Sequence, residues 1–173
     1  MKFLDQLAEH ISQLNRGIGK LISWSSLLLV VLVFVIAIMR YAFKIGSIPM
    51  QELVLYLHAI IFMFGASFTL ADEGHVRVDI IYAKLNEKKK AWVNLLGTLL
   101  FLMPVCVFII YTSFGYVELS WRINESSSEA GGLPYLFLLK SMIVIMPSLL
   151  MLQGLAVVMN SLSTLLGDGK QHD

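Results

Sequence analysis

The sequence predicts an all-α integral membrane protein, a four-helix bundle, and two observations lead to this fold class. Hydrophobic residues make up 57% of the 173 residues and charged residues 14%, whereas soluble domains average about 45–50% and about 25%. The apolar residues also gather in four long runs, each with at most one charged residue. About 20 apolar residues suffice for a helix to cross a hydrocarbon core of roughly 30 Å. Continuous runs of this length exclude the alternating pattern of a transmembrane barrel.

The four runs mark the expected membrane-spanning helices, and residues 1–173 are expected to form a single membrane domain. Their approximate limits are 21–39, 53–71, 91–117 and 134–166. The fourth run contains Lys140 near its beginning. Its remaining residues are uncharged, so the helix is expected to begin before this lysine.

Residues 1–20 precede the first run and have an amphipathic pattern that predicts an interfacial helix at the N-terminus. Apolar residues recur every three or four positions, with polar residues between them, as in helices that lie in a membrane surface. Gly17 and Gly19 would allow the chain to turn into the first span. The alternative is one long helix that continues into that span. The apolar positions are Leu4, Leu7, Ile11, Leu14 and Ile18.

The connection between the second and third helices, residues 72–90, predicts a second, cytoplasmic interfacial segment. Val78, Ile81, Tyr82 and Leu85 give it a short apolar face. The lysines at 88–90 would meet anionic lipid headgroups, so membrane lipids are expected partners. The third connection, residues 118–132, is rich in serine, glycine and glutamate and is expected to be mobile.

The placement of lysine and arginine predicts the orientation. Nine of these residues lie in the N-terminal segment, the middle connection and the C-terminal tail, and four lie on the opposite side. Because cytoplasmic loops carry the excess of lysine and arginine, both termini are expected in the cytoplasm.

Composition and motifs exclude several function classes. A net charge of +1 gives no basic field for a nucleic acid, so none is an expected partner. The single cysteine, Cys106, excludes a disulfide framework and a cysteine metal cluster.

Ionisable side chains within a span are the usual functional candidates, and only His58 lies at depth. Helix packing is the favoured interpretation of His58 over a proton relay. We therefore expect no catalytic, cofactor-binding or metal-binding residues, no cofactor and no enzyme activity.

Two charged residues mark the ends of neighbouring spans. Arg40 closes the first span and Glu52 opens the second, both toward the outer face. The short connection between them contains Gly46 and Pro49, which favour a turn. The sequence therefore suggests an Arg40–Glu52 pair, which would be either a solvated pair or a docking point for another subunit.

The same region resembles a known family. The first span ends in Arg40-Tyr41, Glu52 opens a second span that contains Phe64-Gly65-Ala66, and Asp72-Glu73-Gly74-His75-Val76-Arg77-Val78-Asp79 follows. This order is similar to the small, DctQ-like membrane subunit of tripartite ATP-independent periplasmic (TRAP) transporters. Four spans and cytoplasmic termini agree with the resemblance. The positions that it singles out as candidate subunit-interface or structural residues are Arg40, Glu52, Gly65, Gly74, His75, Arg77 and Asp79.

The resemblance implies a function that composition does not give. TRAP systems import organic acids with ion gradients, and their partners are a large membrane subunit and a periplasmic substrate-binding protein. The small subunit is expected to act as a scaffold for the large subunit, which carries the substrate and sodium sites. General likeness favours sialic acid as the substrate, with a C4-dicarboxylate next. The competing classes are a haem- or quinone-binding anchor of a redox complex and a small exporter that works as a homodimer.

The orientation can be tested with single cysteines in a Cys106→Ser background. We expect Lys89→Cys to react with a membrane-impermeant thiol reagent only after the inner face is exposed, because the middle connection is basic. Lys44→Cys, on the opposite side, is the control and should react from outside. Labelling of Lys89→Cys in intact cells would contradict the assignment.

Overall fold

The computed structural model describes residues 2–72, 82 and 84–167, and its regular elements there are helical. In chain order these are α1 (Lys2–Tyr41), α2 (Ile48–Ala71), α4 (Glu87–Gly97), the π-helix η1 (Thr98–Leu102), α5 (Met103–Arg122) and α6 (Leu136–Gly167).

Four helical runs in the described residues are long and apolar enough to cross a membrane. Elements α4, η1 and α5 follow one another directly, so they count as one run of 36 residues, Glu87–Arg122. The predicted all-α fold class and four-helix membrane bundle are thus confirmed. The helices contain almost all of the four expected spans, and only the first two residues of the fourth span, 134 and 135, precede α6. The residues at which each helix enters and leaves the membrane stay a prediction.

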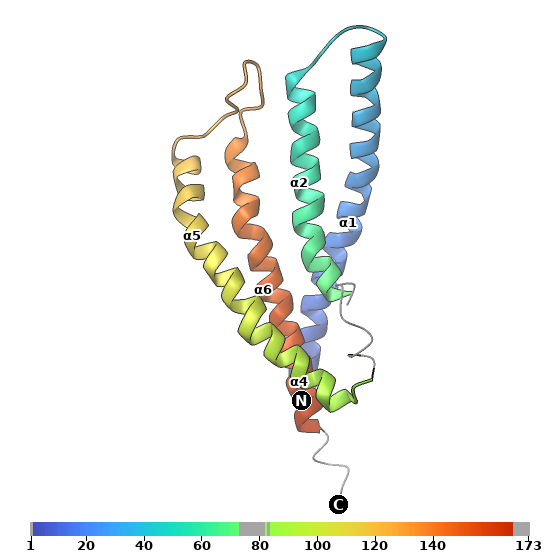
Figure 1. The fold of residues 1–173 in the computed structure, drawn as a ribbon, viewed down its shortest axis with the longest axis vertical. Helices are drawn as coiled ribbons and strands as arrows, with labels where there is room; N and C mark the ends of the chain where they lie inside the picture. Colours follow the sequence, from blue (N-terminus) through green and yellow to red (C-terminus); the bar gives the residue numbers. More distant parts are fainter. Residues whose placement is uncertain (1, 73–81, 83, 168–173) are drawn as a thin grey trace, which may run out of the picture.

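The helices form two hairpins, α1–α2 and α5–α6, and the helices gather at one end and spread toward the other (Figure 1). We call the end that holds the N-terminus and the last turns of α6 the terminal end, and the other the hairpin end. Helix α6 contacts each of the other elements, whereas α5 packs mainly on α6 and η1. The bundle is therefore organised around α6.

The first 20 residues do not form a separate helix, because they continue without a break into the first span, which is the alternative that the sequence left open. Helix α1 runs unbroken through Gly17 and Gly19 for 40 residues, about 60 Å at 1.5 Å per residue. Its buried positions recur at spacings of three and four, and all of them except Ile22 carry small or polar side chains rather than the leucines. Leu7 and Leu14 are 43% and 53% exposed. The buried stripe consists of Ala8, Ser12, Asn15, Gly19 and Ile22.

Two glycines explain how the helices approach so closely. A Cβ atom at Gly19 would overlap the Phe68 ring of α2, and a Cβ atom at Gly154 of α6 would lie 2.8 Å from Leu102 Cδ2 in η1. The absence of a side chain at these positions lets neighbouring helices pack at short range, as small residues do in membrane bundles. Gly19 therefore serves packing rather than a bend.

The expected interfacial segment between the second and third helices lies mostly outside the described residues. Helix α4 begins after it at Glu87, where the Asn86 side chain accepts a hydrogen bond from the Lys89 amide at 3.0 Å. The Tyr82 hydroxyl is 3.1 Å from Asn94 Oδ1. This contact fastens the end of the connection to α4.

A buried amide network joins α1 to α6. Asn15 Nδ2 donates to Gln153 Oε1 at 2.8 Å, and Gln153 Nε2 donates to Ser12 Oγ at 3.2 Å. The three residues are 0%, 3% and 7% exposed. Since a buried polar group without a partner is costly, these bonds fix both the rotation of α1 and its register along α6.

Removal of one member of this network should destabilise the bundle. We expect Gln153→Leu to lower the free energy of unfolding by about 1–3 kcal/mol, because it leaves the Asn15 amide buried and unpaired. The Asn15→Leu/Gln153→Leu double variant should recover part of this loss, since both polar groups are then gone. Thermal unfolding of the detergent-solubilised chain measures the effect, and Asn160→Leu, at an exposed position of the same helix, is the control. Equal melting temperatures for Gln153→Leu and Asn160→Leu would contradict the role of the network.

Candidate functional site

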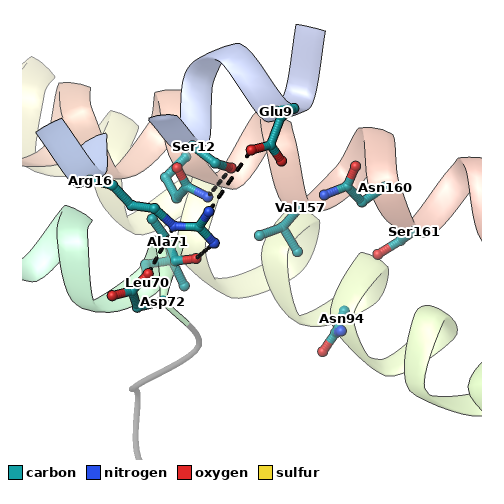
Figure 2. Close-up of a pocket in the computed structure, with 11 residues that line it drawn as sticks. Glu9, Ser12, Arg16, Leu70, Ala71, Asp72, Asn94, Val157, Asn160 and Ser161 are labelled. Atoms are coloured by element: carbon teal, nitrogen blue, oxygen red, sulfur yellow. Dashed lines mark hydrogen bonds and ion pairs between the residues drawn. The ribbon is translucent and has the colours of Figure 1, made fainter. Parts of the chain in front are cut away.

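A polar cleft of about 470 Å³ opens at the terminal end, between α1, α2, α4 and α6. Figure 2 shows Arg16 on one side, between Glu9 and Asp72, and the polar side chains of α4 and α6 on the other. The lining residues are Glu9, Ser12, Arg16, Leu70, Ala71, Asp72, Asn94, Gln153, Val157, Asn160 and Ser161.

Arg16 is the electrostatic centre of this cleft. Its Nε donates to Asp72 Oδ1 at 2.9 Å, its Nη2 lies 3.4 Å from the Ala71 carbonyl oxygen, and its Nη1 lies 3.9 Å from Glu9 Oε1. The last carbonyl groups of a helix lack partners within the helix and attract cations. Arg16 therefore fastens α1 to the C-terminal end of α2. Both Arg16 and Asp72 are nearly half exposed, so the pair is worth under about 1 kcal/mol.

The hairpin end is held by Glu52, which binds the connection between α5 and α6. The Ser127 hydroxyl donates to Glu52 Oε1, and the Leu133 amide donates to Glu52 Oε2 at 2.6 Å. A Cβ atom at Gly132 would lie 2.7 Å from Glu52 Oε1, so glycine leaves room for the carboxylate. We call this arrangement the Glu52 clamp.

A second set of contacts ties the same connection to α6. Lys140 Nζ donates to both Glu125 oxygens, at 2.7 and 2.6 Å, and lies 4.1 Å from the Tyr116 ring centroid. The Lys140 ammonium lowers the pKa of the Glu125 carboxyl below its ordinary value. A lowered pKa means that the pair stabilises the fold at neutral pH and loses this contribution only as the pH falls through that pKa.

These contacts bear on two expectations. The third connection was expected to be mobile, and the structure shows its Ser127 and Glu125 side chains bound to α2 and α6. Glu52 does not pair with Arg40 in the structure: among the described ion pairs, none joins the two residues, and Arg40 is exposed in the last turn of α1. Glu52 instead faces Ser127 and Leu133.

The other candidates from the sequence divide into two groups. Gly65 lies in α2 next to open space, since a Cβ atom there would meet nothing within 4 Å. Gly74, His75, Arg77 and Asp79 lie outside the described residues.

Sequence reasoning missed the roles of Asn15 and Arg16, because their partners are far away along the chain and lie on other helices. The polar residue Gln153 within an apolar run was the available signal for the amide network.

The polar contacts described above hold the helices and their connections together. The ion pairs of the described residues lie at the two ends of the bundle, where Arg16, Lys90, Arg122 and Lys140 each bind a carboxylate. Among the described residues, no group of three or more histidine, cysteine, aspartate or glutamate side chains could hold a metal ion.

The class of protein follows from the helices and these contacts: the chain is a multi-pass helical membrane protein whose polar side chains join its helices. A family model described as the DctQ component of tripartite ATP-independent periplasmic transporters matches residues 29–164. The match covers well over half of the chain, so the chain belongs to the DctQ family and is a small membrane subunit of a TRAP transporter. Comparisons with curated proteins and with solved structures gave no match.

The family match agrees with the resemblance seen in the sequence, and it covers only part of the chain. All seven candidate interface residues, from Arg40 to Asp79, lie within residues 29–164. Asn15 and Arg16, which join α1 to α6 and α2, precede the matched region. The contacts at the terminal end therefore include features that the family match does not cover.

The Glu52 clamp can be tested through the Leu133 amide, which donates directly to Glu52. We expect Glu52→Ala to increase hydrogen–deuterium exchange at Leu133 by about tenfold, because its N–H loses a charged acceptor. Glu118→Ala removes an exposed carboxylate at the same end and should leave Leu133 unchanged, as should Arg40→Ala. Unchanged protection of Leu133 in Glu52→Ala would contradict the clamp.

Proposed function

We propose that this chain is the scaffold subunit of a TRAP transporter that imports an organic acid with a sodium gradient. In this proposal, a large membrane subunit carries the substrate and sodium sites, and a periplasmic binding protein delivers the substrate. Family membership supports this division of labour. Sialic acid is our favoured substrate, with a C4-dicarboxylate as the next choice.

The observation that carries the proposal is the open, largely unburied bundle. In the most apolar 18-residue stretches of α1 and α2, only 6% of the residues are buried within the chain, compared with 17% and 22% in the other two spans. A scaffold subunit must present much apolar surface to lipid and to a partner while keeping its own helices fixed. The amide network and the Glu52 clamp supply that fixation.

We further propose that the protein lies in the bacterial inner membrane with the terminal end in the cytoplasm. The distribution of lysine and arginine supports this orientation. The Glu52 clamp would then lie at the periplasmic face, and the Arg16 cleft at the cytoplasmic face.

Reconstitution in liposomes tests the function. We expect sodium-driven uptake of sialic acid only when this chain, the large subunit and the binding protein are all present. Uptake should fall to background without this chain, because the large subunit then lacks its support. A C4-dicarboxylate in place of sialic acid tests the substrate class.

Two results would contradict the proposal. Uptake by this chain alone would show that it transports without a partner. A Soret band in the absorption spectrum of the purified chain would favour the haem-binding alternative.

A further inference from the structure

One face of α2 carries two exposed polar side chains, His58 within the expected span 53–71 and Gln51 two residues before it. Gln51 and His58 are exposed, and neither side chain has a hydrogen-bond partner among the described residues. His58 lies ten residues after Ile48 and thirteen before Ala71. At 1.5 Å per residue this places it about 15 Å from one end of the helix and about 20 Å from the other. An exposed imidazole is therefore near the middle of α2 and five residues inside the expected span 53–71.

These residues belong to a continuous stripe. Gln51, Leu55, His58, Phe62 and Gly65 follow one another at spacings of four and three, which is the repeat that a packed partner helix contacts. Leu55 and Phe62 are 62% and 68% exposed, and the space beside Gly65 is open. The stripe has the features of a helix-docking surface: large apolar side chains, a small residue for close approach, and polar groups that need partners.

Lipid does not fit this stripe well. Polar side chains within a span are costly against hydrocarbon and usually face protein or water. The short histidine side chain lies about 7.5 Å inside the expected limit of the span at residue 53, so it faces the hydrocarbon region. By comparison, the exposed face of α1 presents Leu28, Val31 and Phe34, which suit lipid chains, and α5 exposes Phe108 and Phe114 beside Tyr111.

We infer that the α2 stripe, Gln51 to Gly65, is the surface on which a membrane-spanning helix of the large subunit docks. This inference rests on the proposed function. The partner helix carries a hydroxyl, amide or carboxylate side chain level with His58, because a neutral imidazole offers one donor and one acceptor. It also places a large apolar side chain against Gly65.

Photo-crosslinking locates the surface directly. Benzoylphenylalanine at Leu55 or Phe62 in the assembled complex should form adducts with the large subunit, identified by mass spectrometry. The same probe at Leu28 of α1 and Phe108 of α5 provides exposed controls. Adducts with the large subunit from the controls and not from α2 would overturn the inference. Adducts from α2 that join two copies of this chain would also overturn it.

Substitution tests the stripe without relying on a probe. Gly65→Leu should lower recovery of the complex by about tenfold while the isolated chain melts as before, since the side chain meets open space within the chain. Gly115→Leu is the matched control, because Gly115 of α5 also faces open space. His58→Leu should reduce recovery, and His58→Gln should restore part of it by keeping a donor and an acceptor.

The outcomes separate this inference from the proposed function. Recovery that is equal for Gly65→Leu, Gly115→Leu and the unmodified chain would overturn the α2 stripe but leave the scaffold role intact. If the unmodified chain fails to copurify with the large subunit, the proposed function itself fails, and the docking surface fails with it.

Discussion

The amide network between α1 and α6 sets the positions of the neighbouring elements. Asn15, Gln153 and Ser12 are buried, and two hydrogen bonds join them, while Asn15 Oδ1 has no partner among the described residues. Between membrane helices no hydrophobic effect selects a register, and specific polar contacts and close packing take its place. Once α1 is fixed on α6 in this way, Arg16 reaches the end of α2, and Gly19 packs against the Phe68 ring.

The two ends of the bundle are fastened by different means. At the terminal end, Arg16 joins α1 to α2 through exposed contacts around an open polar cleft. At the hairpin end, Glu52 and Lys140 hold one connection against α2 and α6, with Lys140 only 14% exposed. Between these ends, α1, α2 and α5 each keep an exposed apolar face. A subunit built in this way is internally fixed and still offers long surfaces to lipid and to a partner.

The sequence predicted the helices well and their contacts poorly. A run of apolar residues predicts a helix from local sequence alone, so the four helices could be predicted. Local motifs likewise allowed the family to be recognised. The first 20 residues were misread because their leucines were assigned to a membrane-facing stripe of a separate helix, whereas the buried face of α1 is made of small and polar residues. Arg40 and Glu52 are close along the chain, yet Glu52 binds Ser127, 75 positions away.

Composition, run length and local motifs were enough to give the fold class, the number of spans and membership of the DctQ family. Which polar side chains meet could be learned from the three-dimensional arrangement alone, since it depends on how each helix is rotated about its axis and placed along its neighbour. The partners of Asn15 and Arg16 lie 138 and 56 residues away, and no local pattern encodes such a distance. The exposed face of α2 could not be predicted from the sequence either, because it is the face that the neighbouring helices leave uncovered.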